Sequence, residues 1–301
     1  MTRVVVTGAN GFIGLHTVRA LLEHGYEVAA VDLTVERVNK ILDENLHVYQ
    51  LDITKDSLEP VLKQGDKILH LAAVSRFAPA EQNPELAIRV NVEGTLRIIL
   101  AARKCKAERL VFSSTGSVYA HDVDVPIRED AKREPTSIYG LSKKFAEDLI
   151  MHFGKQDLRY VILRYGYVYG PGKDWGAIGS FLKRLSENQP PIVYGGQQTN
   201  DFVYVDDVVQ ANLLALETHY TNHAYNIGTG RAYSILDVAK LCCELSGKHL
   251  KPTVLPPRTF DYLLFVYDIT KAKTLLNYEP KWNLYDGVRD MIAKLQANNA
   301  R

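Results

Sequence analysis

The stretch "VTGANGFIG", residues 6–14, places three glycines between an apolar, β-branched segment and a segment with helical spacing. This order of strand, glycine-rich turn and helix is typical of a loop that binds the phosphates of a dinucleotide. Gly8 permits the tight turn, Gly11 lets the backbone approach a pyrophosphate, and Gly14 lets the helix pack against the strand. The N-terminus of the helix adds N–H donors and a partial positive charge. We assign cofactor contacts in this loop to Gly8, Asn10, Gly11, Phe12, Ile13 and Gly14.

Strand-like and helix-like segments alternate through the first half of the chain. Apolar runs typical of strands begin near residues 26, 66, 108 and 159. Runs with helical spacing cover residues 56–65, 84–105 and 136–155 between them. The alternation predicts an α/β fold built on a Rossmann-type, doubly wound parallel sheet.

An acidic residue ends the second predicted strand. Asp32 lies at about the distance from the glycine loop, roughly 20 residues, at which such folds bind the adenosine ribose. A carboxylate there accepts hydrogen bonds from the ribose hydroxyls and repels a 2′-phosphate, and Leu33 and Thr34 bring no adjacent arginine. The sequence therefore favours NAD over NADP. Asp52, in "QLDIT", either meets the adenine or is a solvated aspartate at a strand end.

The composition changes after Tyr165. Residues 166–179 and 256–262 are rich in Gly, Pro and aromatic side chains, which indicates irregular segments that line a site. Residues 204–218 and 224–230 return to helix and strand patterns and are expected to rejoin the sheet. We expect an NAD-binding domain at 1–166 plus about 203–229, and a smaller, mostly C-terminal substrate-binding lobe at about 167–202 plus 230–301.

The bulk composition excludes several classes of function. The 301 residues carry a net charge of +1, so no field of one sign points to nucleic acid. No apolar run approaches the roughly 20 residues that span a bilayer, so we expect no membrane partner. The three cysteines have no disulfide or metal-ligand spacing, so no metal site is predicted. The first strand begins by Arg3, leaving no room for a signal peptide, and we expect a cytoplasmic protein.

A phenol and an amine are expected on one helix face. Tyr139 and Lys143, in "YGLSK", stand four residues apart, which places them one helical turn from each other. A free tyrosine has a pKa near 10, about three units too high for a base at neutral pH. A neighbouring ammonium and an oxidised nicotinamide both favour the phenolate. The pair predicts removal of a hydroxyl proton while hydride leaves the same carbon, although such pairs also occur on helix surfaces by chance.

The order of these motifs resembles that of the extended short-chain dehydrogenases/reductases, within the nucleotide-sugar epimerase/dehydratase family. The resemblance covers nearly the whole chain and implies NAD as cofactor and a nucleotide sugar as substrate. It also implies a homodimer built from the helices at about 84–104 and 136–153. The similar segments are "TGANGFIG", "LDIT", "HLAA", "RVNVEGT", "FSSTGSVYA", "YGLSK", "RYGYVYGPG", "DFVYVDD" and "YNIGTG".

The resemblance also implies roles for individual residues. Thr115 would bond the substrate oxygen and share its proton with Tyr139, and Lys143 would hold the nicotinamide ribose. Asn91 either tethers the backbone near the catalytic strand or has no role. The further cofactor contacts implied are Asp52, Ile53, Leu71, Ala72, Ala73, Ser113, Ser114 and Tyr165. The substrate contacts implied are Ser75, Thr115, Tyr167, Tyr194, Asn200 and Arg258.

Four positions distinguish subclasses of the family. Gly116 and Ser117 stand where sugar 4,6-dehydratases carry Asp-Glu, and decarboxylating relatives keep a Glu at the place of Ser117. The sequence therefore favours epimerisation, at C4 of a UDP-sugar, with dehydration or decarboxylation as alternatives. Tyr167 and Asn200 replace an Asn and an Arg that hold the substrate diphosphate in the family, while Arg258 could still hold a phosphate. Those replacements leave open a net dehydrogenase or reductase for a smaller carbonyl compound. A cofactor-bound protein without turnover is a third class.

Overall fold

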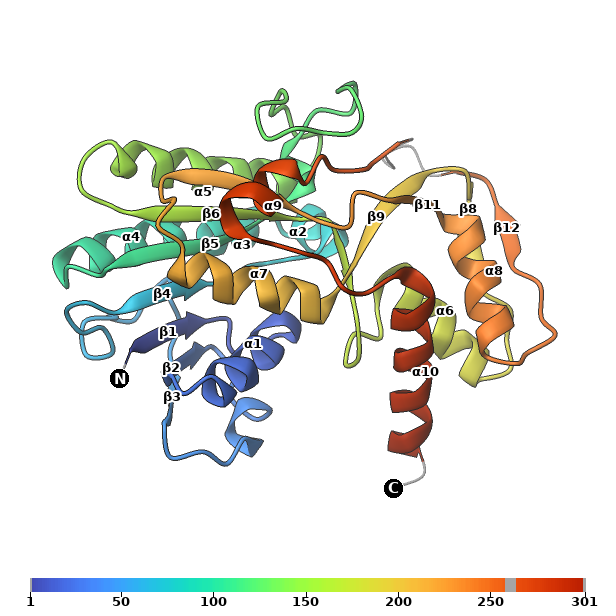
Figure 1. Ribbon diagram of the computed structural model, residues 1–301, viewed down its shortest axis with the longest axis horizontal. Coiled ribbons are helices and arrows are strands. Elements are labelled where there is room, and N and C mark those ends of the chain that lie inside the picture. Colours follow the sequence, from blue (N-terminus) through green and yellow to red (C-terminus); the bar gives the residue numbers. More distant parts are fainter. Residues whose placement is uncertain (1, 258–263, 300–301) are drawn as a thin grey trace.

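A seven-stranded parallel sheet forms the centre of the molecule (Figure 1). The computed structural model describes residues 2–257 and 264–299. The strand order is β10-β6-β5-β4-β1-β2-β3, which is the doubly wound order with one further strand at the β6 edge. The strands are β1 (Arg3–Thr7), β2 (Glu27–Asp32), β3 (Leu46–Gln50), β4 (Lys67–His70), β5 (Arg109–Thr115), β6 (Tyr160–Tyr165) and β10 (His223–Ile227). The predicted fold class is confirmed, and residues 224–227 do rejoin the sheet, beside β6.

Helices cover both faces of this sheet, because alternate residues of each central strand point to opposite sides. Val4 and Val6 belong to a core shared with α1 (Phe12–Glu23) and α7 (Val205–Glu217). Val5 belongs to a second core shared with α4 (Thr95–Lys104) and α5 (Ile138–Gly154). With both faces buried, the strands read as continuous apolar runs, which is why the sequence reveals them.

Two small sheets and four helices build the remainder (Figure 1). Tyr169, Phe202 and Val288 belong to the same apolar core as Val4, so this part packs continuously against the main sheet. The strands are β7 (Tyr167–Tyr169), β8 (Ile192–Tyr194), β9 (Thr199–Tyr204), β11 (Ala232–Ser234) and β12 (Thr253–Leu255). The helices are α6 (Gly176–Ser186), α8 (Ile235–Leu245), α9 (Thr270–Leu276) and α10 (Leu284–Asn299).

The helix predicted at residues 56–65 is wrong. This segment consists of turns in the structure. Pro60 lacks the N–H that a helix interior needs. At the start of this segment, the guanidinium of Arg97 donates to the backbone oxygens of Lys55 and Asp56 at 2.9 and 2.8 Å. The neighbouring edge strand β3 was not predicted, because its residues are half-buried or exposed and show no continuous apolar run.

The long helix expected at residues 84–105 is present but not uniform. It begins as α3 (Pro84–Ile88), where the side chain of Asn83 accepts a hydrogen bond from the Leu86 N–H at 3.0 Å. A π-helical stretch, η2 (Arg89–Gly94), then leads into α4. Such widened turns often occur near functional sites. The connections also contain α2 (Phe77–Gln82) and the 3₁₀ turns η1 (Val38–Lys40) and η3 (Gly116–Val118).

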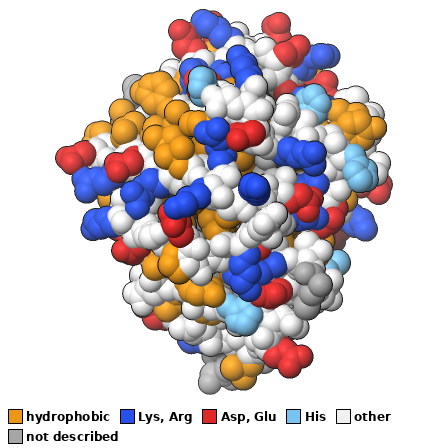
Figure 2. Space-filling model, turned by 90° about the vertical axis from the view of Figure 1, so that its left-hand side faces the viewer, with side chains coloured by type: hydrophobic (Ala, Val, Ile, Leu, Met, Phe, Trp, Pro, Cys, Tyr) orange, Lys and Arg blue, Asp and Glu red, His pale blue; other side chains and the backbone are white. Residues whose placement is uncertain are grey.

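Charges of both signs are mixed on the face of the molecule that Figure 2 shows. Figure 2 shows the side of the molecule at the left of Figure 1, where Lys and Arg side chains alternate with Asp and Glu. This pattern agrees with the net charge of +1. Within residues 2–257 and 264–299, no helix has the length and apolar character to cross a lipid bilayer.

Candidate active site

A cavity of about 640 Å³ opens at the carboxyl ends of the central strands. This is where open parallel sheets bind their ligands. The glycine loop, the ends of β2, β4, β5 and β6, the start of α5 and the segment after β6 all border it. Every residue assigned to the cofactor lines this cavity except Asn91. Ser75, Thr115, Tyr139, Lys143 and Tyr167 line it as well.

The glycine loop is packed too tightly for side chains. Gly8 has φ +73°, and a Cβ there would lie 2.6 Å from the backbone N of Ala72. A Cβ on Gly14 would lie 2.1 Å from the backbone oxygen of Gly8. Gly11 precedes α1, and no side chain caps the first N–H groups of that helix. A tight turn with an uncapped helix N-terminus facing a cavity fits the pyrophosphate of a dinucleotide.

Asp32 and Asn10 connect this loop to the end of β2. The Asn10 N–H donates to Oδ2 of Asp32 at 2.9 Å. The amide of Asn10 is fully used: Oδ1 accepts from the N–H groups of Arg37 and Val38, both at 2.9 Å, and Nδ2 donates to Thr34 at 2.9 Å. The Asn10 side chain therefore holds the loop in place. Burial raises the pKa of Asp32, and this carboxylate faces the cavity with room to accept from a ribose.

The strand ends beside the loop supply the apolar wall. Ile53, Leu71, Ala72 and Ala73 all border the cavity. Asp52 also borders it, but its Oδ1 accepts from the N–H and the hydroxyl of Thr54 at 2.9 and 2.7 Å. These bonds lower the pKa of Asp52 and fix it as the cap of a turn. Contact with the adenine remains a prediction.

The hydroxyls at the end of β5 differ in what they contact. Ser113 donates to a backbone oxygen of β4 at 3.1 Å, and Ser114 donates to the carboxylate of Glu147. Both protons are therefore used within the protein. Thr115 is hydrogen-bonded to the phenol of Tyr139, and both line the cavity. The Thr115 hydroxyl also accepts from the Ser117 N–H at 3.2 Å and donates to the Ser117 hydroxyl at 3.3 Å, a long contact that a ligand oxygen could replace. Thr115 and Tyr139 are thus the hydroxyl groups that can meet the same ligand oxygen.

Tyr139 and Lys143 lie in the first two turns of α5, where Ser137 caps the helix by accepting from the Gly140 N–H at 3.0 Å. Burial raises the pKa of Tyr139 to about 12, against the hydrogen bond from Thr115, which lowers it. Burial lowers the pKa of Lys143 to about 7, against the charge of Glu147, which raises it. The Lys143 ammonium lies 4.0 Å from the ring centroid of Phe112. Perturbed pKa values of this kind in one cavity are typical of catalytic groups.

Comparison with known proteins assigns the chain to a family. Residues 4–228 match the NAD dependent epimerase/dehydratase family. The chain belongs to this family. A UDP-glucose 4-epimerase of Lactobacillus helveticus is 31% identical over 317 residues, covering 97% of this chain and 95% of the relative.

Solved structures of the family agree over the full length. The UDP-glucose 4-epimerase of Thermotoga maritima, solved with UDP-glucose, superposes with a TM-score of 0.93 at 33% identity and covers 99% of this chain and 100% of its own. The UDP-glucuronic acid 4-epimerase of Bacillus cereus, solved with UDP-glucuronic acid and NAD, gives 0.91 at 30% identity over 98% of this chain and 100% of its own. The family resemblance predicted from the motifs is confirmed, and NAD is the cofactor of this enzyme family.

Two of the predicted cofactor residues use their side-chain polar groups in hydrogen bonds within the protein. Asn91 is buried away from the cavity, and its amide bonds both backbone groups of Val74 and the hydroxyl of Ser142. It ties the segment after β4 to α5, and its role toward the cofactor stays a prediction. Tyr165 borders the cavity, but its hydroxyl donates to Asn212 on α7, so only its ring and backbone face a ligand.

The predicted substrate residues are dispersed. Tyr194 lies at the end of β8, and Asn200 lies in β9 opposite Tyr233 of β11. Neither borders the cavity within the described part of the chain. Tyr167 does, and its hydroxyl accepts from the Ala177 N–H at 2.8 Å. Arg258 lies outside the described residues.

Several residues that border the cavity were not singled out from the sequence. Lys173 and Trp175 come from the Gly- and Pro-rich segment after β6, and Leu86 and Val90 come from α3 and η2. The composition of residues 166–179 does indicate a site-lining segment, but not which side chains enter it. An isolated lysine or tryptophan in a loop has no spacing that would distinguish it from a surface residue.

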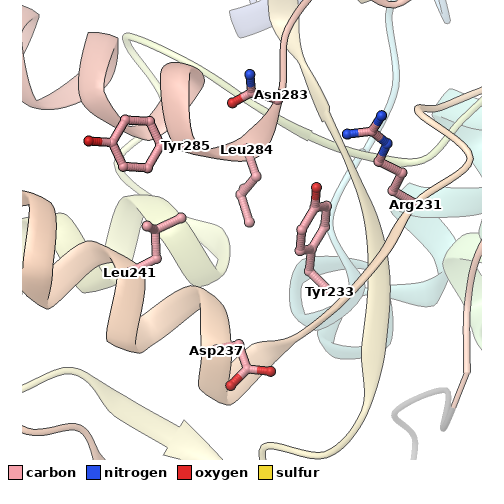
Figure 3. Close-up of a pocket in the computed structure, with 7 residues that line it drawn as sticks. All are labelled: Arg231, Tyr233, Asp237, Leu241, Asn283, Leu284 and Tyr285. Carbon is pink, nitrogen blue, oxygen red and sulfur yellow. The ribbon is translucent and has the colours of Figure 1, made fainter.

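A second cavity, of about 560 Å³, lies between β11, α8 and the start of α10 (Figure 3). Leu241, Leu284 and Tyr233 point toward one another across it, with Arg231 at one side and Asp237 at the foot. None of the predicted catalytic or cofactor residues lines it. Its wall is mainly apolar and lacks a paired proton donor and acceptor, so the chemistry belongs to the first cavity.

Proposed function

We propose that this protein interconverts UDP-sugars that differ in configuration at C4, through a 4-keto intermediate and without net oxidation. The observation that carries the proposal is the Thr115, Tyr139 and Lys143 cluster in the same cavity as the glycine loop. The epimerases that the chain resembles over its full length support the UDP-sugar.

The residues of the cavity perform the proton chemistry. Bound NAD supplies the acceptor, and then the donor, of the hydride that leaves and returns to C4. Tyr139 takes the proton of the 4-hydroxyl and later returns it to the keto oxygen. Thr115 bonds the same oxygen and keeps it aligned with the phenol. Lys143 places a positive charge near Tyr139, which stabilises the phenolate that burial disfavours.

The charge distribution in the cavity favours epimerisation over elimination. Among the described residues that line the cavity, the carboxylates are Asp32, which ends β2, and Asp52, which follows β3. Thr115 instead ends β5, and the next residues, Gly116 and Ser117, form the turn η3 without an acid. Dehydration needs a further acid and a further base at the sugar. Decarboxylation is expected to use a carboxylate at the place of Ser117. Epimerisation needs only rotation of the keto sugar and a second hydride transfer.

Purified protein incubated with UDP-glucose, UDP-N-acetylglucosamine and UDP-glucuronate tests the proposal. The C4 epimer should accumulate to an equilibrium mixture, with no stoichiometric NADH at 340 nm. In D₂O the product should keep hydrogen at C4, because the hydride is returned rather than exchanged. Stoichiometric NADH would instead indicate a net dehydrogenase, and loss of water or CO₂ would indicate the other chemistries of the family.

The same proposal includes the oligomeric state, the compartment and the division of the chain into two parts. We infer a homodimer through α3, α4 and α5, which expose Leu86, Ile88, Leu100 and Phe145. A reducing compartment such as the cytoplasm is supported by the thiols of Cys105, Cys242 and Cys243, which form no disulfide. The chain would divide into the NAD-binding and substrate-binding parts given above. Sedimentation of wild-type protein and of Leu100→Lys tests the dimer.

A further inference from the structure

Lys173 is a partly buried cation of the cavity with no role in the proton chemistry above. It lies in the segment between β7 and α6 and borders the cavity. Its ammonium donates to the backbone oxygen of Val168 at 2.6 Å. Three aromatic rings surround it, with ring centroids 5.8 Å (Phe12), 5.3 Å (Tyr167) and 5.7 Å (Trp175) from Nζ. Burial lowers its pKa to about 8.

This ammonium has no anionic partner in the part of the chain that the structure describes. No carboxylate among residues 2–257 and 264–299 forms an ion pair with it, and one of its three N–H groups is used by Val168. Lys67, a lysine whose side chain is buried, is paired with Glu217 at 2.7 Å. An unpaired charge removed from water costs free energy that a partner must offset. Aromatic faces compensate for this cost only in part.

The surroundings of Lys173 select an anion as that partner. Phe12, whose ring lies beside the ammonium, is the first residue of α1. The uncapped N–H groups and the dipole of α1 attract negative charge to the same part of the cavity. The other lysine of the cavity, Lys143, lies on α5 beside Tyr139. Lys173 is therefore placed to meet the phosphate part of a ligand and not its reacting carbon.

We propose that Lys173 binds a phosphate oxygen of the ligand in this cavity and is a specificity residue for diphosphates. The diphosphate belongs either to NAD or to the sugar nucleotide, which share this chemistry. The second source rests on the proposed function, and the first does not.

Lys173→Met tests the proposal, because Met keeps the length and apolar contacts of the side chain without its charge. Lys173→Arg tests rescue, and Lys183→Met, at an exposed position of α6, is the matched control. NAD affinity is measured by displacement of etheno-NAD, so protein purified with nucleotide can be used. UDP affinity is measured by calorimetry on NAD-saturated protein, with uridine as the probe that lacks phosphates.

Lys173→Met should weaken one of the two ligands roughly 10- to 100-fold, the range expected for a lost hydrogen bond to a charged group. Lys173→Arg should recover part of this loss, and the salt dependence of the affected affinity should decrease in Lys173→Met. Whichever affinity decreases, that for NAD or that for UDP, identifies the ligand whose phosphate contacts Lys173. Uridine affinity and the unfolding midpoint should stay as in the wild type.

The proposal is overturned if NAD and UDP both bind Lys173→Met within about twofold of the wild type. It is also overturned if affinity falls together with the unfolding midpoint and uridine binding, since that pattern indicates a structural role. Neither readout uses turnover. A protein that loses UDP affinity on substitution but forms no C4 epimer would contradict the proposed function alone.

Discussion

Replacing Tyr139 by Phe removes the proposed proton acceptor while keeping the ring. Burial raises the pKa of Tyr139 to about 12, so at neutral pH the phenolate lies about 7 kcal/mol above the phenol, at roughly 1.4 kcal/mol per pKa unit. The Lys143 ammonium and the bound cofactor must supply most of that difference during the reaction. Loss of a general base costs typically 10²- to 10⁴-fold in rate. We expect kcat of Tyr139→Phe to fall by this factor.

The assay is the rate of C4 epimer formation at saturating UDP-sugar, with separate measurements of NAD affinity and thermal unfolding. Both should change little, because among the described residues the phenol is hydrogen-bonded to Thr115 alone. One such hydrogen bond contributes about 0.5–1.5 kcal/mol to the free energy of unfolding, so the loss of stability should not exceed this. Tyr285→Phe, at an exposed position of α10, is the control. A kcat decrease below tenfold, or one explained by lost NAD, would refute the assignment of Tyr139 as the base.

Four further substitutions examine the cofactor site and its support. Asp32→Ser should weaken NAD by roughly 10- to 100-fold and narrow the preference over NADP, measured by titration, since a charged acceptor and a repulsive charge are both removed. Gly14→Ala should lower stability by about 1–3 kcal/mol and NAD affinity with it, because its Cβ would lie 2.1 Å from a backbone oxygen. Gly11→Ala should have a smaller effect, because its Cβ would lie 3.1 Å from the backbone oxygen of Gly8. Equal effects of the two substitutions would contradict the steric argument. Glu147→Gln should cost about 3–5 kcal/mol in urea unfolding, because it leaves the buried Arg164 guanidinium without its carboxylate; a loss below 1 kcal/mol would show that the pair is not required.

The central sheet and the cofactor end of the cavity could be predicted because short segments determine them. Inner strands such as β1 and β4 are buried on both faces, so their apolar runs are continuous and visible without knowledge of their neighbours. The glycine loop is likewise local, since Gly8 and Gly14 are needed for contacts within or next to one β–α unit. Tyr139 and Lys143 share a helix face by spacing alone. Parallel order then brings these segments to one sheet edge.

The substrate end could not be predicted in the same way, because long-range packing decides it. Tyr194 and Asn200 lie on small sheets whose pairing partners, β12 and β11, come from distant parts of the chain. Lys173 gains its meaning only from burial beside Phe12, which is 161 positions earlier in the sequence. The predicted helix at 56–65 failed for a related reason. Arg97 of α4 donates to the backbone oxygens of Lys55 and Asp56, where that segment begins.

The charges of the cavity impose a direction on any ligand that fills it. Asp32 ends β2 and Thr115 ends β5, with β1 and β4 between them, so the two ends lie about 14 Å apart at roughly 4.8 Å per strand spacing. The acidic end suits hydroxyl donors of a ribose and repels phosphates, whereas Lys143 and Lys173 favour negative charge. A dinucleotide can satisfy both ends only with its adenosine over β2 and its reactive ring toward Tyr139. The same polarity leaves the phosphate-bearing part of a second ligand no favourable position near Asp32.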